Sequence, residues 1–308
     1  MVKVFIDGKE GTTGLKIYER LGSRRDIEIL TLPEEQRKDV SARKGKINSA
    51  DVVFLCLPDA AAKEAVSLCE NDRVIIIDAS TAHRTDSGWV YGFPELSKAH
   101  REKIAHSRRI AVPGCHASGF ISLVYPLIAG GIVRPDYPFV CHSVTGYSGG
   151  GKKMIAEYES DDRSPEFDSP RQYGMAQKHK HLPEMTKVCG LEFAPIFNPI
   201  VADYYSGMCV TVPLYGRLMA EKMSVEQLKE YFAEYYARQN FVKIMDTMPP
   251  YLSANPLAGT NRMQIYVDGN DERIVLASVF DNLGKGASGA AVQCMNIALG
   301  LDERTSLE

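Results

Sequence analysis

The stretch VKVFIDGKEGTTGLKI, from Val2 to Ile17, has the pattern of a strand, a glycine-rich turn and a helix start. Apolar residues run almost continuously at first, and they recur at helical spacing after the turn. Five residues of the turn are expected to approach a phosphate: Gly8, Gly11, Thr12, Thr13 and Gly14. The spacing is G-x-x-G-x-x-G rather than G-x-G-x-x-G, but glycines let backbone approach a pyrophosphate and a helix N-terminus favours negative charge. We therefore expect a dinucleotide site, the alternative being a turn that serves only tight packing.

Strand-like and helix-like segments alternate through the first 112 residues. After the opening strand, further strands are expected at Ile27–Leu32, Asp51–Leu57, Arg73–Asp78 and Arg109–Val112. Helices are expected at residues 12–21, 59–71 and 94–106. Nearly continuous apolar strands are typical of a parallel sheet covered on both faces. This half predicts an α/β fold with a Rossmann-type parallel-sheet domain.

A different pattern follows residue 115. An apolar helix is expected through Ile121–Ile128 and an amphipathic helix over residues 224–239. The polar stretch 161–174 is predicted to be a loop, and a glycine-rich loop from residue 281 leads into a C-terminal helix. Strands are expected at Tyr137–Thr145, 203–216, 262–269 and Arg273–Phe280, and several alternate polar and apolar residues. This half predicts an α+β domain with a mixed or antiparallel sheet.

The bulk composition limits the classes of partner. The chain has 308 residues and a formal net charge of −3, without a basic stripe, so we expect two domains and no nucleic-acid partner. It shows no charged leader before an apolar segment and no apolar run of about 18 residues, so we expect a cytoplasmic protein with no membrane partner. The seven cysteines include no C-x-x-C pair, which argues against a disulfide framework and a structural zinc site.

The residues beyond the second strand decide which dinucleotide is expected. An acidic residue there binds the ribose of NAD, whereas basic residues accommodate the 2′-phosphate of NADP. The segment PEEQRKDVSARKGK supplies five cations: Arg37, Lys38, Arg43, Lys44 and Lys46. We predict NADP(H), contacted by Arg37 and Lys38; a solvated helix face of mixed charge is the alternative.

The stretch AVPGCHASGF, residues 111–120, places Cys115 directly after a Pro-Gly pair and at the start of a helix. Free N–H groups and the helix dipole stabilise a thiolate at such a position, and the same N–H groups can hold an oxyanion. We predict that Cys115 is a catalytic nucleophile, while most of the other cysteines are buried packing residues.

A thiolate needs a proton partner, and the stretch QKHKHLPEM offers His179 and His181. Glu184 follows closely and is predicted to orient a histidine or to bind substrate. The i, i+2 spacing of the histidines resembles a metal site, but no third ligand is apparent, so we favour acid–base chemistry and predict no metal.

Two glycine-rich segments carry further candidates. The stretch GYSGG matches the G-x-S-x-G nucleophile elbow, and an α/β-hydrolase with Ser148 as nucleophile is the alternative catalytic interpretation. We favour a loop that binds an anionic substrate through Ser148, Gly149 and Lys152, with Lys153 beside them. In DNLGKGASG, Asn282 is predicted either to cap the last helix or to bring its amide towards the nicotinamide.

The whole chain resembles the shorter type of N-acetyl-γ-glutamyl-phosphate reductase, in the superfamily of aspartate-semialdehyde and glyceraldehyde-3-phosphate dehydrogenases. The resemblance rests on motifs that occur in order, including FIDGKEGTTGLKI, IIDASTAHRT, VPGCHASGF, HKHLPEM and DNLGKGASGAAVQ. It implies NADPH-dependent reduction of an acyl phosphate through a thioester on Cys115, with one of the two histidines as acid–base. An aminoadipyl or aspartyl phosphate remains an alternative substrate, and a regulatory protein that has lost catalysis is the alternative of another class.

The resemblance also implies an organisation and further contacts. Residues 1–114 with about 283–308 are expected to form the NADP-binding domain, and about 115–282 the catalytic and oligomerisation domain of a homodimer or homotetramer. Ser80, Asn282 and Gly286 are implied to lie near the cofactor. The longer type of the family often has tyrosine after the catalytic cysteine, whereas this chain has His116, whose influence on the thiolate stays open.

Overall fold

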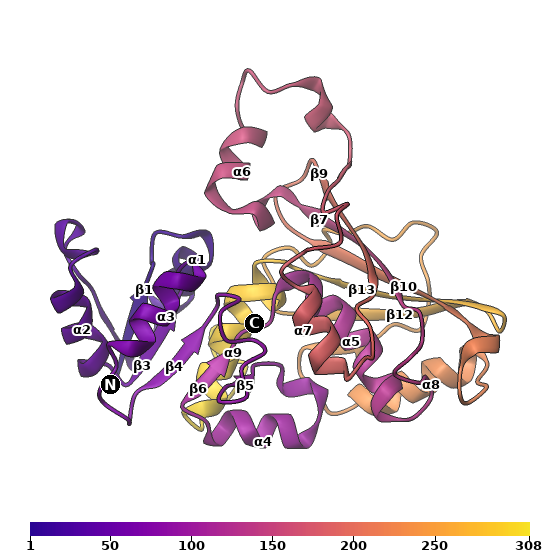
Figure 1. Cartoon of the computed structure of the whole chain (residues 1–308), viewed down its shortest axis with the longest axis horizontal. Coiled ribbons are helices and arrows are strands. Elements are labelled where there is room, and N and C mark those ends of the chain that lie inside the picture. The colour runs from indigo at the N-terminus through magenta and orange to yellow at the C-terminus, as the bar shows by residue number, and fades with distance from the viewer. The chain divides into compact units, whose positions relative to one another are not determined.

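The structure, a computed structural model, describes all 308 residues and separates into two compact units (Figure 1). The first unit comprises Met1–Pro113 and Ala287–Glu308, and the second comprises Gly114–Gly286. Each unit is built on one sheet, of six strands in the first and seven in the second.

The six strands of the first unit are all parallel, in the order β2-β1-β3-β4-β6-β5. They are β1 (Val2–Asp7), β2 (Ile27–Leu30), β3 (Val52–Leu55), β4 (Ile75–Asp78), β5 (Val90–Tyr91) and β6 (Arg109–Ala111). All four residues of β3 and of β4 are buried, because helices cover both faces of the sheet. The chain leaves β1 for β2 on one side and returns to β3 on the other, and ligands collect at such a reversal in α/β sheets.

The helices of the first unit are α1 (Thr12–Leu21), α2 (Val40–Ser49), α3 (Asp59–Ser67), α4 (Lys98–His106) and α9 (Gly289–Ala298), with short 3₁₀ turns at Glu34–Gln36 and Pro94–Leu96. Helix α2 packs against α3, and α9 packs against α1, α4 and β4. The side chain of Gln293 on α9 donates hydrogen bonds of 2.8 Å to Glu95 and to Glu303, all within this unit. The C-terminal helix thus belongs to the first unit, although the whole second unit intervenes in the sequence.

The second unit contains a mixed sheet in the order β11-β12-β13-β10-β7-β9-β8. Its strands are β7 (Val140–Gly146), β8 (Arg171–Gln172), β9 (Ile196–Ala202), β10 (Met208–Tyr215), β11 (Val242–Ile244), β12 (Met263–Asn270) and β13 (Arg273–Phe280). The pairs β7–β9 and β11–β12 are parallel, and the others are antiparallel. Residues of β10 alternate between buried and more exposed, so one face of the sheet lies in the core and the other is more open.

The helices of this unit are α5 (Cys115–Ala129), α6 (Gly151–Tyr158), α7 (Leu182–Cys189) and α8 (Val225–Tyr236). Short helical turns occupy Tyr147–Gly150, Pro165–Asp168 and Gly216–Leu218, and a π-helical turn at Gly284–Ser288 leads towards α9. The apolar helix α5 packs on β10, β13 and α7, whereas α8 packs on β11 and β12.

The predicted fold class is confirmed, with a parallel-sheet α/β domain followed by an α+β domain whose sheet is mixed. Two predicted segments are divided differently in the structure, and several other elements begin or end a few residues from their expected bounds. The helix expected over 94–106 is divided at Ser97, which is extended and caps α4 by accepting a hydrogen bond from the N–H of His100. The loop expected over 161–174 contains a 3₁₀ turn and β8. The sequence analysis did not predict the strands β5, β8, β9 and β11 or the helices α6 and α7; three of these strands have only two or three residues. Helix α2 was expected only in the alternative interpretation of the basic segment.

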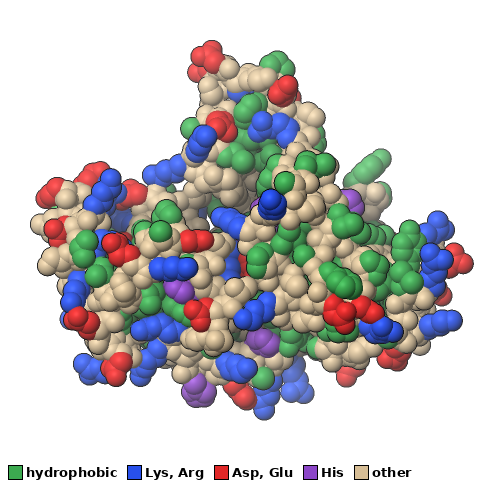
Figure 2. Space-filling model, in the orientation of Figure 1, with side chains coloured by type: hydrophobic (Ala, Val, Ile, Leu, Met, Phe, Trp, Pro, Cys, Tyr) green, Lys and Arg blue, Asp and Glu red, His purple; other side chains and the backbone are tan.

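Acidic and basic side chains are interspersed over the face drawn in Figure 2, in keeping with the small net charge. None of the helices combines the length and the apolar character that crossing a membrane requires.

Candidate active site

The glycine turn after β1 has the geometry that only glycine allows. Gly8 has φ of +86°, and a Cβ there would lie 2.3 Å from the carbonyl oxygen of Cys56. A Cβ on Gly14 would lie 2.5 Å from the carbonyl oxygen of Gly8. Helix α1 begins at Thr12 without a side-chain cap, and the hydroxyl of Thr12 is buried with no hydrogen-bond partner. Uncapped N–H groups and an unsatisfied hydroxyl fit an anionic group of a dinucleotide.

A pocket of about 480 Å³ lies at the carboxyl ends of β1, β2 and β3. The predicted cofactor contacts that line this pocket are Gly8, Gly11, Arg37 and Lys38. The other three residues of the turn motif, Thr12, Thr13 and Gly14, form the start of α1 and do not line it. The three residues directly after β2 are Thr-Leu-Pro and carry no carboxylate. The guanidinium of Arg37 lies 2.6 Å from Glu34 and 3.7 Å from Glu10, both exposed carboxylates.

Other cations of the basic segment are engaged elsewhere. Arg43 is buried, and its guanidinium lies 2.9 Å from Asp7 and 2.7 Å from Glu64. Lys44 lies 2.6 Å from Glu70. Arg43 therefore stabilises the first unit instead of offering a charge to a 2′-phosphate.

Ser80 lies just beyond β4 in a buried network. Its N–H and hydroxyl both donate to the carboxylate of Asp78, at 2.9 and 2.7 Å. The same carboxylate lies 2.6 Å from Nδ1 of His83, whose ring stacks on Trp89 at a centroid distance of 4.1 Å. The Ser80 hydroxyl is thus committed as a donor to Asp78, and Ser80 does not line the 480 Å³ pocket. Sequence reasoning did not identify Asp78 or His83.

In the second unit, Cys115 is the first residue of α5, and its N-cap, Gly114, provides no side-chain hydrogen bond to the helix. The thiol is half-buried. The N–H of Gly114 donates to Oε2 of Glu184 at 3.1 Å, and Glu184 is only 1% exposed, in the first turn of α7. A Cβ on Gly286 would lie 2.9 Å from the Cβ of Cys115. The structure therefore brings together Cys115, Glu184 and Gly286, three of the predicted residues.

The two predicted histidines lie side by side, with ring centroids 4.7 Å apart. His181 is buried and is the N-cap residue of α7, whereas His179 is half-buried. Nδ1 of His179 accepts a hydrogen bond of 3.2 Å from the N–H of His181. An accepting Nδ1 carries no proton, so the neutral His179 ring carries its proton on Nε2 and can donate it.

His116 and Tyr173 belong to the same cluster. The His116 ring lies 5.5 Å from that of His179 and 5.6 Å from that of His181. Its Nδ1 lies 2.6 Å from the hydroxyl of Ser143, and its Nε2 lies 2.8 Å from the hydroxyl of Tyr173. Burial, followed by the charges of His179 and Lys180, lowers the pKa of His116 to about 3, so its ring is neutral at physiological pH.

The loop that carries Tyr173 and His179 is fixed to β9. The side chain of Gln177 donates to the carbonyl of Phe197 and accepts from its N–H, both at 2.8 Å. Gln177 has a φ of +55°, which non-glycine residues seldom adopt. The paired hydrogen bonds hold the loop in this conformation. They thereby fix the ring cluster, which consists of His116, Tyr173, His179 and His181.

Ser148 and Asn282 form a separate buried contact. The amide nitrogen of Asn282 donates to the Ser148 hydroxyl at 2.9 Å, and its amide oxygen accepts from the N–H of Gly207 at 2.8 Å. Asn282 therefore supports the helical turn after β7, in which Gly149 is exposed. Lys152 is also exposed but belongs to α6, so the segment predicted to be a loop is a helical turn followed by a helix. The buried Ser148 hydroxyl bound to an amide lacks the exposed geometry of a nucleophile elbow, which argues against the hydrolase interpretation.

Two family models cover most of the chain. One, described as the NAD binding domain of semialdehyde dehydrogenase, matches residues 3–106. The other, described as the semialdehyde dehydrogenase dimerisation domain, matches residues 115–282. A protein from Nostoc sp. named N-acetyl-gamma-glutamyl-phosphate reductase 2 is 45% identical over 99% of each chain.

The chain belongs to the N-acetyl-γ-glutamyl-phosphate reductase family of semialdehyde dehydrogenases.

Other relatives agree with this placement. N-acetyl-gamma-glutamyl-phosphate reductase of Burkholderia lata is 46% identical over 96% of each chain. Among solved structures, aspartate semialdehyde dehydrogenase II of Vibrio cholerae matches with a TM-score of 0.73 at 15% identity, covering 97% of this chain and 98% of that one. Aspartate semialdehyde dehydrogenase with NADP from Candida albicans matches with a TM-score of 0.69 at 15% identity over 96% and 98%. At such identities the solved structures show a shared fold only.

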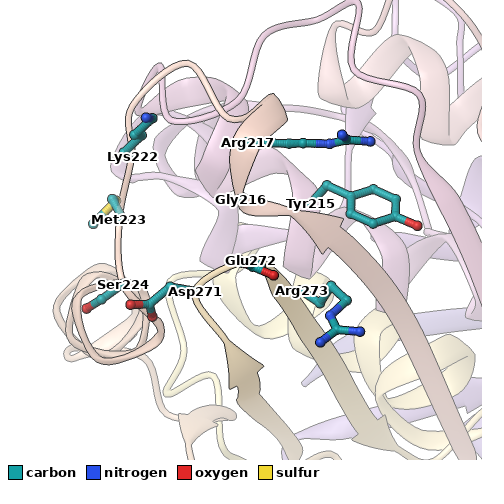
Figure 3. A pocket seen from close by; sticks show the side chains of 9 residues that line it. All are labelled: Tyr215, Gly216, Arg217, Lys222, Met223, Ser224, Asp271, Glu272 and Arg273. Atoms are coloured by element: carbon teal, nitrogen blue, oxygen red, sulfur yellow. The ribbon is translucent and has the colours of Figure 1, made fainter.

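Membership of the N-acetyl-γ-glutamyl-phosphate reductase family confirms the predicted resemblance and assigns residues 3–106 to an NAD(P)-binding domain. A second pocket of about 700 Å³ lies within the family's dimerisation domain, at the ends of β10 and β13 (Figure 3). Three cations line it: Arg217, Lys222 and Arg273. In Figure 3 the side chain of Arg217 extends away from the segment that carries Lys222. None of the predicted site residues lies there. The structure shows no group of three His, Cys, Asp or Glu side chains that could hold a metal ion.

Proposed function

We propose that the protein is an NADP-dependent N-acetyl-γ-glutamyl-phosphate reductase, which converts the acyl phosphate to N-acetylglutamate semialdehyde and releases phosphate. The names of its relatives support this substrate. The observation that carries the chemistry is Cys115 at the start of α5, with Glu184 bonded to the residue before it and two histidines in the same unit. An aminoadipyl or aspartyl phosphate is the alternative substrate.

In the first half of the reaction, the Cys115 thiolate attacks the carbonyl carbon of the acyl phosphate. The carbonyl π electrons move to oxygen, and N–H groups at the start of α5 stabilise this oxyanion. The C–O bond to phosphate then breaks, phosphate leaves with the electron pair, and a thioester remains on Cys115. NADPH, when bound, supplies the hydride that reduces this thioester.

In the second half, we assign the acid–base role to His179. Its Nδ1 accepts the N–H of His181, so Nε2 holds the proton that the oxygen of the thiohemiacetal receives. The same nitrogen takes the proton back as the C–S bond breaks, which releases the aldehyde and restores the thiolate. His181, buried at the N-cap of α7, supports this geometry.

We assign cofactor contacts to the first unit. The turn from Gly8 to Gly14, with Thr12 and Thr13, would hold the pyrophosphate, and Arg37 and Lys38 the 2′-phosphate. Ser80 would act through the shape of the loop after β4, since its hydroxyl binds Asp78. The approach of Asn282 and Gly286 to the nicotinamide stays a prediction, as does the binding of substrate by Ser148, Gly149, Lys152 and Glu184.

The organisation of the chain follows the same proposal. We propose that the first unit binds NADP(H), and that the second performs catalysis and forms a homodimer or homotetramer through its sheet. The domain boundaries expected at residues 114 and about 283, and the cytoplasmic location, likewise stay predictions.

The deciding experiment is the reverse reaction, with NADP reduction followed by nicotinamide absorbance in the presence of N-acetylglutamate semialdehyde and phosphate. We expect turnover with this aldehyde, faster with NADP than with NAD, and none for Cys115→Ala, which should still bind NADPH. Cys209→Ala, another half-buried cysteine of the same unit, is the matched control and should stay active.

Parallel reactions contain aspartate semialdehyde or N-acetylated aminoadipate semialdehyde. Turnover with only one of these would reassign the substrate. Binding of NADPH without turnover of any aldehyde would favour the regulatory protein.

A further inference from the structure

The ring cluster contains a hydrogen-bonded chain that the reaction above does not use. It runs from Ser143 on β7 through His116 on α5 to Tyr173, directly after β8. Ser143 and His116 are buried and Tyr173 is half-buried. The three side chains come from separate elements, and His116 follows Cys115 in the sequence.

The direction of this chain follows from the satisfaction of buried protons. His116 is the only hydrogen-bond partner of the Ser143 hydroxyl, so Ser143 satisfies its proton by donating to Nδ1 of His116. In the opposite direction the proton of Ser143, which is 0% exposed, has no acceptor, and this costs about 1–3 kcal/mol. In the direction chosen here the unpaired proton is that of Tyr173, which is only half-buried. With Nδ1 accepting, the neutral ring carries its proton on Nε2 and donates it to the oxygen of Tyr173. The hydroxyl proton of Tyr173 then has no acceptor among these three side chains.

Tyr173 is therefore a neutral phenol with a proton to donate. Burial is the main cause that raises the pKa of Tyr173, and the charge of Cys115 adds to it, which keeps the phenol protonated. Its ring lies 6.1 Å from that of His179, and its hydrogen-bond partner His116 directly follows Cys115 in the first turn of α5. No hydrogen bond joins Tyr173 to the sulfur, so its phenol proton stays available to an oxygen of a group that binds there.

We propose that Tyr173 is a further catalytic residue, whose hydroxyl donates a hydrogen bond to the oxyanion formed when Cys115 attacks an acyl group, and that His116 and Ser143 are its positioning residues. No proton leaves Tyr173, because the bond only stabilises the charge. The proposal rests on the proposed function only in taking Cys115 as the nucleophile.

The test compares two reagents that attack the same sulfur in the full-length protein. p-Nitrophenyl acetate acylates the thiolate through a tetrahedral oxyanion: a C–S bond forms, the C–O bond breaks, and p-nitrophenolate leaves. Iodoacetamide alkylates the thiolate by direct displacement of iodide, without an oxyanion. Neither reaction needs NADPH or the native substrate, and Cys115→Ala gives the background of both.

We expect Tyr173→Phe to slow acylation about a hundredfold, as loss of one oxyanion donor does, and to leave alkylation within about twofold of the unmodified protein. The matched control is Tyr231→Phe, which removes a half-buried hydroxyl that donates to the carbonyl of Pro126 at 2.7 Å, and it should change neither rate. An acylation rate unchanged in Tyr173→Phe would overturn the proposal. So would an equal slowing of both reactions, since that would place the effect on the thiolate itself.

Two substitutions of His116 test the positioning role. Asparagine places a polar atom near the position of Nδ1, and glutamine places one near the position of Nε2. We expect His116→Asn to slow acylation like Tyr173→Phe, and His116→Gln to recover much of the rate. The double variant His116→Asn/Tyr173→Phe should be no slower than Tyr173→Phe alone. Additive losses, or equal rates for the asparagine and glutamine variants, would exclude a role exerted through Tyr173.

The result of the acylation test can be distinguished from the result of the reverse reaction with the aldehyde. If no aldehyde is turned over but acylation depends on Tyr173 as described, the substrate assignment fails and this inference stands. If the aldehyde is turned over and acylation is indifferent to Tyr173, the inference alone fails.

Discussion

The N–H of Gly114 donates a hydrogen bond to the buried carboxylate of Glu184, with 3.1 Å between the nitrogen and Oε2. This contact ties the residue before the nucleophile to the first turn of α7, so the start of α5 is fixed by a side chain from another helix. Glu184 thus acts on the position of Cys115 as well as being a candidate for substrate binding.

Glu184→Ala should lower both stability and kcat, because it leaves the buried N–H of Gly114 without its acceptor. The loss of a hydrogen bond to a charged group predicts about 1.5–3 kcal/mol of unfolding free energy. Glu184→Gln keeps an acceptor oxygen and should retain more of both quantities. Urea unfolding and steady-state kinetics of the two variants check this. Equal behaviour of the two would show that the contact does not matter.

His179→Gln should lower kcat by roughly 10²–10⁴-fold, the usual contribution of a general acid or base. His181→Asn should cost much less, since asparagine is a favourable N-cap residue for α7. The measurement is kcat of the reverse reaction across pH for both variants. Two equal and small effects would mean that neither histidine transfers the proton.

Replacing Arg37 and Lys38 together by glutamine should weaken NADPH binding by roughly a hundredfold or more, at about 1.5–3 kcal/mol for each of the two bonds to a charged group, and NADH binding much less. The physical reason is that only NADPH carries the 2′-phosphate. Lys44→Gln is the matched control, because its ammonium pairs with Glu70 outside the pocket. Fluorescence titration with both dinucleotides measures the difference, and an equal loss for the two would refute the 2′-phosphate contact.

Gly14→Ala should destabilise the protein and weaken dinucleotide binding, because the new Cβ would lie 2.5 Å from the carbonyl oxygen of Gly8. Gly45→Ala is its control in another helix of the same unit, where no atom lies within 4 Å of the new Cβ. That control should gain about 0.5–1 kcal/mol from helix propensity. Thermal unfolding with and without NADPH compares the two, and similar shifts would contradict the close approach in the turn.

His116 predicts a pH dependence of stability. Its folded-state pKa of about 3 lies below the ordinary value of 6.5, so between these values the unfolded chain binds a proton that the folded protein does not. The free energy of unfolding therefore falls as pH falls through this window, by at most about 1.4 kcal/mol per pH unit from this group. His116→Gln should reduce that slope, whereas the exposed His106→Gln should not. Urea unfolding at pH 7, 6 and 5 checks it, and parallel slopes for all three proteins would contradict the burial effect.

The fold followed largely from local patterns. The glycine turn, the apolar strands and the change of pattern near Cys115 predicted two kinds of sheet, because each is set by residues close in sequence. The short strand β8 could not be predicted, since its two residues lie in a polar segment and are ordered only by pairing with β9. Because β9 also lay outside the prediction, the attachment of the loop with Tyr173 and His179 to β9 was not anticipated.

The sequence singled out candidate site residues one by one but not their contacts. Cys115, His179 and His181 stood out because their types and spacing carry chemistry, and their roles stay predictions. Tyr173 was not anticipated because a tyrosine in a loop has no local signal, and the role proposed for it follows only from its hydrogen bond to His116. Likewise Arg43 resembled a phosphate contact in sequence, but its partner Asp7 lies 36 residues away.

The stacking of Trp89 on His83 gives the first unit an internal optical reporter. Trp89 is the only tryptophan of the chain, so the intrinsic indole emission arises from one place. Its ring lies 4.1 Å from the imidazole that binds Asp78, and Asp78 also holds Ser80 just beyond β4. A change in the emission of the unlabelled protein would therefore report a rearrangement at this strand end, and the response of that strand end to added NADPH could be followed in real time with no attached dye.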